Sequence, residues 1–279
     1  MIMKIFVNER IQSFPENMTA GKLRDEKKPG ADVIIVNGYP CEEDSILKEG
    51  DQVALIKKGE IPKSEELEAL MIARHSPGVH ERMKTATVGV AGLGGLGSSV
   101  SIALTRMGLG TLIIADHDVV EPSNLNRQQY SVDQIGLSKT EAMEKNLANM
   151  NPYVKVIAHN VVLNAHNIPK IFKTADIIVE CFDRVEEKTM ILETVAECMP
   201  EVYVIGASGL AGYGDSNSIQ TRRIGEKIFI IGDMKKSAGP GQGLMAPRVG
   251  IAAHHQANLV VSLLIDPIQA ILKIPDLVE

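Results

Sequence analysis

The order of apolar and polar positions divides the chain into two parts with different periodicities. In the first 58 residues the apolar runs are short, and several of them alternate with polar residues as strands do. They predict a hairpin at 3–14, a short helix capped by Thr19, a buried strand at 32–40 and a last strand within 44–59. Four strands and one helix in so few residues indicate a small mixed sheet with one packed helix.

From residue 85 onward, buried strands alternate with amphipathic helices. The predicted strands are 85–92, 110–116, 154–160, 175–182 and 202–208, and the main helices are 95–108, 138–150 and 186–199. This order is typical of a doubly wound, Rossmann-like α/β sheet that is mainly parallel. The segments 216–224 and 227–233 predict an antiparallel extension, and 246–265 predicts a long closing helix.

These patterns predict two domains: residues 1–58 form the small β domain, 59–66 a linker, and 67–279 the α/β domain. The net charge of -6 argues against general nucleic-acid binding. The N-terminus is charged by its fourth residue, which argues against a signal peptide, and the longest apolar run is too short to span a membrane. We therefore expect a cytoplasmic protein. The chain has 3 cysteines and no Cys-x-x-Cys pair, so neither a disulfide framework nor a zinc site is expected.

A glycine-rich loop opens the first helix of the α/β part. Gly92, Gly94 and Gly97 fit the pattern G-x-G-x-x-G, with Gly95 between them. Backbone N–H groups at such a helix start favour a phosphate, and Asp116 at the end of the next strand is suited to bind ribose hydroxyls. The loop predicts a nucleotide site, although the glycines could instead serve close packing. These residues alone do not separate NAD from ATP.

Charged residues further along favour ATP over NAD. Adenylation builds negative charge on an α-phosphate and needs cations there, whereas hydride transfer does not. Asn124, Arg127, Lys139 and Asp183 all follow predicted strands at one edge of the sheet, and an aspartate there can hold Mg²⁺. Each has a simpler interpretation: Lys139 is solvated, Arg127 pairs with Glu121, or Asp183 caps the helix that follows.

Several motifs, in this order and spacing, resemble the ThiF/MoeB/HesA family of adenylating enzymes related to ubiquitin-activating enzymes. They are GLGGLGSS, ADHDVVEPSNLNRQ, GLSKTEA and ECFDR, and the similarity runs from about residue 67 to 265. The resemblance implies an enzyme that uses ATP to activate the C-terminal carboxylate of a ubiquitin-like sulfur carrier, giving an acyl-adenylate and pyrophosphate.

The resemblance also implies roles for individual residues. The glycine loop would hold phosphates and Asp116 the ribose, while Asn124, Arg127 and Lys139 would contact the triphosphate and Asp183 the magnesium ion. The family also inserts an arginine from the partner subunit, for which Arg74 is the candidate. A homodimer is therefore expected.

The first 57 residues resemble ThiS, the β-grasp sulfur carrier of thiamine biosynthesis. A working carrier ends in Gly-Gly with a free carboxylate, but here Gly59-Glu60 leads directly into the following segment. We therefore expect a structural or docking module instead of a substrate. The chain also lacks the zinc-binding Cys-x-x-Cys pairs of many relatives and a cysteine in the loop 233–248. Adenylation without a covalent cysteine intermediate is therefore expected on this chain.

Three functions remain open at this point. The first is an ATP- and Mg²⁺-dependent adenylyltransferase acting on a ThiS-like carrier. The second is an NAD-dependent oxidoreductase, which predicts bound NAD and no magnesium requirement. The third is a non-catalytic module that binds ATP under the control of the fused β-grasp domain, which predicts binding without turnover.

Overall fold

The structure, a computed structural model, describes residues 2–76, 78–236, 239 and 241–276. Its internal contacts divide the chain into two compact units, Met1–Pro77 and Gly78–Glu279, which we call unit 1 and unit 2. The division that we predict, with a linker at 59–66 and a domain at 67–279, stays a prediction, and its last three residues lie outside the described residues.

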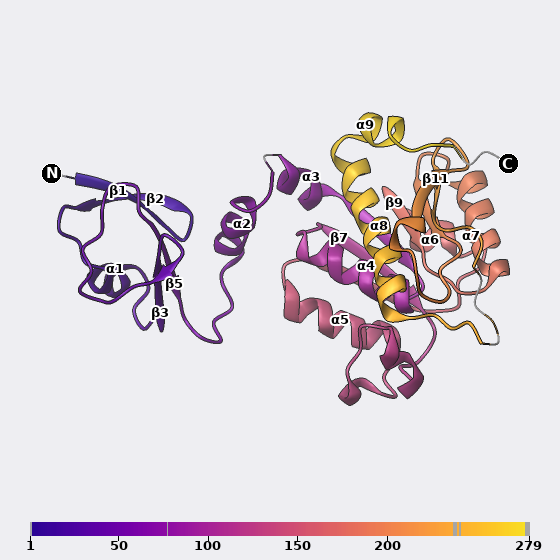
Figure 1. The fold of residues 1–279 in the computed structure, drawn as a ribbon, viewed down its shortest axis with the longest axis horizontal. Helices are drawn as coiled ribbons and strands as arrows, with labels where there is room; N and C mark the ends of the chain where they lie inside the picture. Colours follow the sequence, from indigo (N-terminus) through magenta and orange to yellow (C-terminus); the bar gives the residue numbers. More distant parts are fainter. Residues whose placement is uncertain (1, 77, 237–238, 240, 277–279) are drawn as a thin grey trace. The chain divides into compact units, whose positions relative to one another are not determined.

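Unit 1 is a five-stranded mixed sheet with one helix packed on it (Figure 1). Its elements are β1 (Ile2–Val7), β2 (Arg10–Pro15), α1 (Ala20–Lys27), β3 (Val33–Val36), β4 (Tyr39–Pro40), β5 (Gln52–Ile56) and α2 (Ser64–Ile72). The order β2-β1-β5-β3-β4, with β1 parallel to β5 at the centre, is that of a β-grasp fold. This confirms the fold predicted for this part of the chain.

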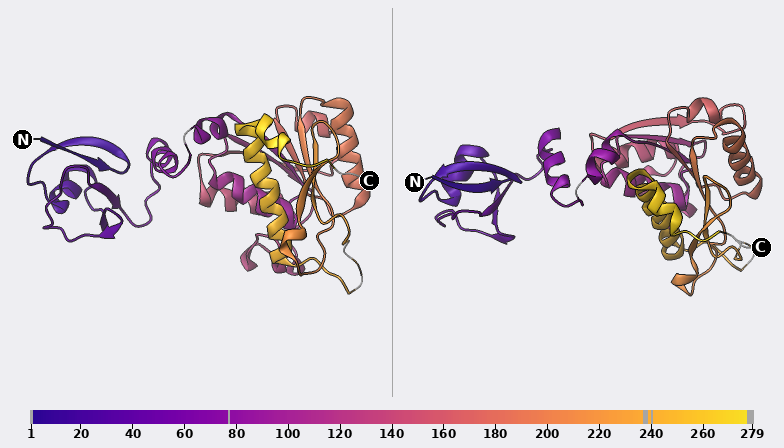
Figure 2. Two further views of the ribbon diagram at one scale, coloured as in Figure 1. Left: turned by 45° about the horizontal axis from the view of Figure 1, so that its top comes forward. Right: turned by 90° about the horizontal axis from the view of Figure 1, so that it is seen from above.

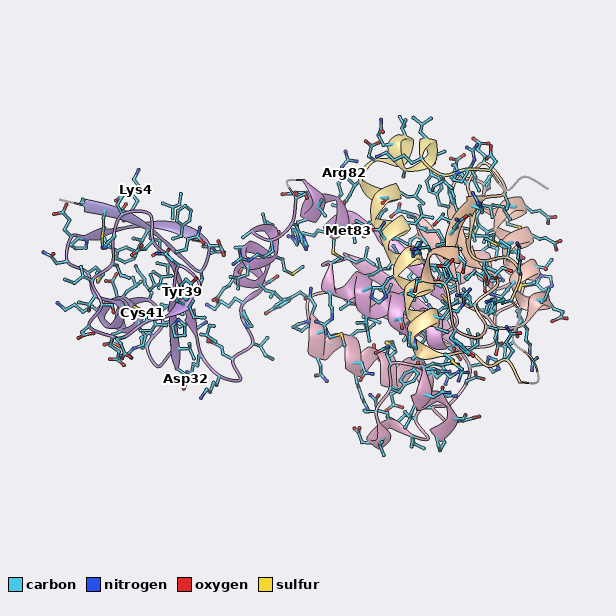
Figure 3. The ribbon with its side chains drawn as sticks, in the orientation of Figure 1. Lys4, Asp32, Tyr39, Cys41, Arg82 and Met83 are labelled. Carbon is cyan, nitrogen blue, oxygen red and sulfur yellow. The ribbon has the colours of Figure 1, made fainter. Side chains whose placement is uncertain are left out.

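Local chemistry explains the elements of unit 1. Asn8 and Glu9 both have positive φ, as the two-residue turn of a β-hairpin requires. The Thr19 side chain accepts a hydrogen bond from Lys22 N and caps α1, as predicted. In β1 the side chains alternate, so that Ile5 is buried and Lys4 projects into solvent (Figure 3).

Unit 2 is a three-layer α/β structure built on a seven-stranded sheet (Figures 1 and 2). Its strands are β6 (Thr87–Ala91), β7 (Thr111–Asp116), β8 (Lys155–Asn160), β9 (Ile177–Glu180), β10 (Tyr203–Ala207), β11 (Gln220–Arg223) and β12 (Ile228–Gly232). Its α-helices are α3 (Val79–Thr85), α4 (Gly95–Arg106), α5 (Lys139–Met150), α6 (Ile168–Ile171), α7 (Val185–Cys198), α8 (Ala246–Ile265) and α9 (Pro267–Leu272).

The strand order is β11-β12-β10-β9-β6-β7-β8, and every neighbouring pair except β11–β12 is parallel. The predicted doubly wound sheet is therefore confirmed. The antiparallel extension is β11, while β12 continues the parallel set beside β10. The order reverses around β6, because β7 lies on one side of it and β9 on the other. Ligands bind at such a switch point, outside the carboxyl ends of the strands.

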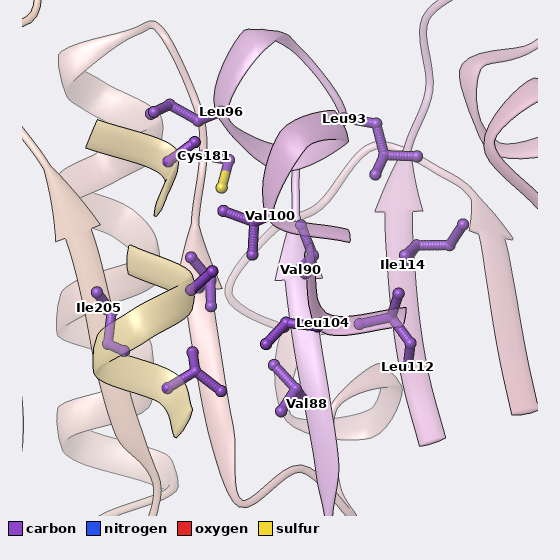
Figure 4. Close-up of a cluster of buried hydrophobic side chains, with 14 of the residues drawn as sticks. Val88, Val90, Leu93, Leu96, Val100, Leu104, Leu112, Ile114, Cys181 and Ile205 are labelled. Atoms are coloured by element: carbon purple, nitrogen blue, oxygen red, sulfur yellow. The ribbon is translucent and has the colours of Figure 1, made fainter. Parts of the chain in front are cut away.

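Two hydrophobic cores hold the layers together. One lies between the sheet and helices α3, α4, α5 and α8, and the other lies between the sheet and helices α6 and α7. Figure 4 shows Val100 and Leu104 of α4 among side chains of the strands, including Val88 and Val90. Helix α8 packs against α4. These contacts fix the start of α4 over the carboxyl end of β6.

No helix in the described part of the chain is long and apolar enough to cross a membrane.

Candidate functional site

The glycine loop connects β6 to α4, and its glycines serve different purposes. A Cβ atom at Gly97 would lie 1.8 Å from the carbonyl oxygen of Gly92, so this position excludes any side chain. Gly92 has φ of 91° and lies against the backbone of Cys181. A Cβ at Gly95 would lie 2.9 Å from Val249 Cγ1. At Gly94, which precedes α4 as its N-cap, the nearest atom would be 3.9 Å away.

The packing alternative thus accounts for three of the four glycines, but not for Gly94. Gly94 is partly exposed and has space beside it, at the helix start where the first N–H groups have no partner within α4, which fits a bound phosphate. The nearest atom is Nε2 of Gln128, a buried residue whose Oε1 has no hydrogen-bond partner within the described chain.

Two side chains hold the loop at Leu93. Oδ2 of Asp116 accepts a hydrogen bond from Leu93 N at 2.6 Å, and the hydroxyl of Tyr130 donates to Leu93 O at 2.9 Å. Oδ1 of Asp116 accepts from Asp118 N at 2.8 Å. Burial, together with the negative charges of Asp116 and Asp118, raises the pKa of Tyr130, so this hydroxyl remains a donor. Asp116 is therefore part of the loop's support as well as a candidate ribose ligand.

Lys139 is buried at the first position of α5 and does not have the solvated position considered above. Its Nζ lies 2.7 Å from Oδ2 of Asp118. Burial by itself would raise the pKa of Asp118, but the hydrogen bond and charge of Lys139 outweigh it, so the pKa lies below its ordinary value. His117 and Arg184 act in the same direction.

The segment after β7 carries Asn124 and Arg127. Oδ1 of Asn124 accepts from Glu121 N at 3.0 Å, which caps a short 3₁₀ turn at Pro122–Asn126. Nη1 of Arg127 donates to Asn126 Oδ1 at 2.9 Å, and no ion pair with Glu121 forms among the described residues. A Cβ at Gly95 would lie 3.5 Å from Arg127 Cγ, so the arginine stem packs against the glycine loop.

Asp183 lies in the turn between β9 and α7 and is exposed. The N-cap of α7 is Arg184 with no side-chain cap, so the interpretation of Asp183 as a helix cap does not hold. Asp183 forms no hydrogen bond or ion pair with the described residues, which leaves its carboxylate oxygens accessible. Oxygen ligands of this kind fit Mg²⁺.

These loops converge on one edge of the sheet. Gly92 touches the backbone of Cys181, two residues before Asp183. Arg184 influences the pKa of Asp118, which is bonded to Lys139. Arg74 is the exception: it belongs to unit 1, follows α2, is 77% exposed and lies 3.5 Å from Glu9.

Sequence reasoning missed a buried ion pair beside this edge. Glu180, the last residue of β9, is fully buried, and its Oε1 lies 2.8 Å from Nζ of Lys188. Burial raises the pKa of Glu180, and the positive charge of Lys188 opposes that rise. A glutamate that ends an apolar run was the available signal, because a buried charge needs a partner.

Two of the three cysteines, Cys181 and Cys198, lie in unit 2. Burial and the charge of Glu180 raise the pKa of Cys181 well above its ordinary value, which makes it a poor nucleophile. Cys198 is exposed at the far end of α7. In the loop 233–248, residues 237, 238 and 240 lie outside the described residues.

Comparison with known proteins assigns both parts of the chain. The ThiF family matches residues 67–273, and the ThiS-like ubiquitin family matches residues 3–59. Ubiquitin-like modifier-activating enzyme 5 of Xenopus laevis is 35% identical over 159 residues, which cover 53% of this chain and 39% of that protein. The adenylyltransferase and sulfurtransferase MOCS3 of Caenorhabditis briggsae is 38% identical over 112 residues, covering 40% of this chain and 28% of its own. The chain thus spans well under half the length of these relatives.

Solved structures share the fold at low sequence identity. The tRNA N6-threonylcarbamoyladenosine dehydratase TcdA of E. coli, in complex with ATP, aligns with a TM-score of 0.66 at 18% identity. The alignment covers 77% of this chain and 99% of that one. MccB of E. coli with ATP aligns with a TM-score of 0.50 at 24% identity, over 67% of this chain and 57% of its own. At these identities the likeness establishes the fold alone.

Proposed function

The chain belongs to the ThiF family, and from that premise we propose that it is an ATP- and Mg²⁺-dependent adenylyltransferase. Its substrate is the C-terminal carboxylate of a free ThiS-like sulfur carrier that ends in Gly-Gly, the kind of carrier that serves thiamine biosynthesis. The products are the carrier acyl-adenylate and pyrophosphate. The enzyme acts as a cytoplasmic homodimer in which Arg74 reaches the site of the partner subunit.

The observation that carries this proposal is the accessible Gly94 at the start of α4, with Arg127 packed beside it and Asp183 accessible on the adjoining turn. The carrier carboxylate attacks the α-phosphorus, and the bond to the leaving pyrophosphate breaks. Arg127 and Lys139 offset the charge that develops on the phosphate oxygens. Asp183 would hold the magnesium ion, whose charge would offset that of the phosphate oxygens.

The ion pair of Lys139 bears on this role. In the structure its charge is directed at Asp118, which is half exposed. A triphosphate carries more negative charge than one carboxylate, so Lys139 turns toward the phosphates when ATP binds. Asp118 then serves to hold the lysine in the site before the substrate arrives.

Contacts within unit 1 support the view that the fused β-grasp module is not itself the substrate. A carrier's tail must extend freely from the end of its last strand, here β5. Instead, Lys58 N donates to Oδ2 of Asp32 at 2.7 Å, and Glu60 lies 2.9 Å from Lys28 (Figure 3 labels Asp32). Lys28 also pairs with Glu66 of α2. The segment after β5 is therefore tied back to its own unit.

ATP–pyrophosphate exchange tests the proposal. Purified protein is incubated with ATP, labelled pyrophosphate, Mg²⁺ and candidate carriers that end in Gly-Gly. We expect exchange that requires both the metal and the matching carrier, and none with a carrier that lacks its last glycine. ATP binding without exchange for every carrier would favour the non-catalytic module.

Thermal unfolding separates ATP from NAD. A ligand at a hundredfold excess over its Kd stabilises the native state by about 2.7 kcal/mol. ATP with Mg²⁺ should therefore raise the melting temperature, whereas NAD should not. Stabilisation by NAD alone would overturn the ATP assignment and favour an oxidoreductase.

A further inference from the structure

Glu180 is a fully buried carboxylate that the proposed reaction does not use. Its oxygens accept four hydrogen bonds: Oε1 from Phe182 N at 2.7 Å and Lys188 Nζ at 2.8 Å, and Oε2 from Lys188 Nζ at 3.2 Å and Ala207 N at 3.3 Å. The side chain thus joins the end of β9, the following turn, the neighbouring strand β10 and helix α7.

Stability alone is a weak explanation for this pair. Removing the charge of Glu180 from water costs several kcal/mol, whereas Lys188 stays partly exposed, and a buried ion pair is often replaced by apolar residues without loss of stability. Strand β10 also carries Gly206, where a Cβ would lie 2.8 Å from Ile230 Cδ1 and 3.0 Å from Oε2 of Glu180. The carboxylate therefore occupies part of the space that a side chain at 206 would need.

What the pair fixes is the short turn 181–183. Phe182 N, one residue before Asp183, is bonded to Glu180. Cys181 N donates to Ala91 O at 2.9 Å, and buried Gln256 of α8 donates to Glu180 O at 3.0 Å. The turn is therefore anchored through its backbone, at Cys181 N and Phe182 N, and through the carbonyl of Glu180 that precedes it.

The same turn contacts the glycine loop. A Cβ at Gly92 would lie 3.1 Å from Cys181 O, which is close backbone packing. The position of Asp183 relative to the phosphate loop is therefore set by residues 180–182. A displacement of residues 182 and 183 would move the candidate metal ligand away from the phosphates, while the hydrogen bonds of the loop to Asp116 and Tyr130 would stay in place.

We propose that Glu180 and Lys188 are positioning residues that hold Asp183 at a fixed distance from the glycine loop and thereby set the affinity for the Mg²⁺ that accompanies ATP. This inference rests on the proposed function. Partners that orient a metal ligand typically account for 10–100-fold in metal affinity.

The test compares the full-length chain with Glu180→Gln, which keeps the shape but removes the charge. Because this change leaves Lys188 unpaired, the double variant Glu180→Gln/Lys188→Met is measured as well. One readout is binding of a fluorescent ATP analogue during titration with Mg²⁺, and a second is binding of Mn²⁺ followed by electron paramagnetic resonance. We expect the half-saturating metal concentration to rise about tenfold or more. Binding of the analogue in EDTA should change less than about twofold, because the glycine loop is untouched.

Two controls separate positioning from general destabilisation. Ile191→Ala empties a core position of α7 and removes none of the hydrogen bonds that hold the turn, so it should lower the melting temperature and leave the metal dependence unchanged. Glu201→Gln removes the carboxylate of an exposed ion pair with Lys227. It should change neither the melting temperature nor the metal dependence.

The outcomes are distinct. The inference would be overturned if the folded Glu180 variants had a lower melting temperature, as Ile191→Ala does, but titrated with metal as the wild type does. The proposed function would still stand. A wild-type chain that binds no ATP analogue at any metal concentration would refute the proposed function itself.

Discussion

Replacing Gly94 by alanine separates a loop built for a ligand from one built for packing. The backbone at this position has a negative φ of -71°, with ψ of -152°, and the added methyl would approach only Gln128, at 3.9 Å. Alanine is a poorer N-cap than glycine by up to about 1 kcal/mol. It also restricts the unfolded chain, which returns about 0.4–1 kcal/mol. The free energy of unfolding should therefore change by less than about 1 kcal/mol.

Gly97→Ala provides the contrast within the same loop. Its methyl would lie 1.8 Å from the carbonyl oxygen of Gly92, which is backbone and cannot turn aside. Overpacking usually costs about 1–3 kcal/mol, and this overlap is at the upper end. Since 1 kcal/mol corresponds to about 2–4 °C in a unit of this size, a fall of roughly 6–12 °C is expected.

Two measurements suffice: thermal unfolding without ligand, and titration with a fluorescent ATP analogue. Gly94→Ala should unfold as the wild type does but bind the analogue about tenfold more weakly or worse, a loss of ~1.4 kcal/mol. Gly97→Ala should instead have a lower melting temperature in the absence of ligand. Wild-type affinity in Gly94→Ala would refute the assignment of this loop to phosphates, and wild-type stability in Gly97→Ala would refute the packing argument.

Three further substitutions test the surroundings of the loop. Arg127→Ala should slow pyrophosphate exchange by about 10²–10³ while ATP affinity changes less, since its contact strengthens in the transition state; normal exchange would mean that this arginine only holds the segment. Tyr130→Phe should leave the buried carbonyl of Leu93 unsatisfied and cost about 1–3 kcal/mol in the free energy of unfolding, measured by urea titration. In the folded protein the pKa of Asp118 is lowered. The pairing with Lys139 therefore contributes stability above the unfolded pKa, and this contribution is lost as the pH falls through the folded pKa. Asp118→Asn should therefore differ from the wild type by up to about 1 kcal/mol at pH 7, and the difference should vanish in acid; a constant difference would contradict the assignment.

The fold was predictable because its signals are local. Alternating burial in β1, the turn at Asn8-Glu9 and the switch to strand–helix alternation at residue 85 each depend on neighbouring residues. The parallel direction of β12 was not predictable, because it is set by pairing with β10, a partner more than 20 residues away. A hydrophobic strand that follows another strand looks the same in sequence whether it pairs parallel or antiparallel.

The placement of the candidate residues at one edge of the sheet was predictable, but the contacts between them were not. Because carboxyl ends of parallel strands share an edge, the positions of Asp116 at the end of one strand and Asp183 just after another were enough to bring them to one side. The contacts that shape the loop join residues that are remote in sequence, as Tyr130 and Leu93 do across 37 positions. No pattern of apolar and polar residues encodes such a hydrogen bond.

Asp116 shows why this geometry matters for interpreting mutations. Both of its oxygens already accept backbone N–H groups, from Leu93 and Asp118, so a ribose hydroxyl would share an acceptor that also shapes the loop. Asp116→Ala should weaken nucleotide binding whether the aspartate binds ribose or shapes the loop, because the change removes the ribose contact and also releases Leu93. Tyr130→Phe releases Leu93 from the other side and leaves the carboxylate in place. A loss of affinity much larger in Asp116→Ala than in Tyr130→Phe would therefore assign the difference to ribose, whereas equal losses would mean that the aspartate acts through the shape of the loop.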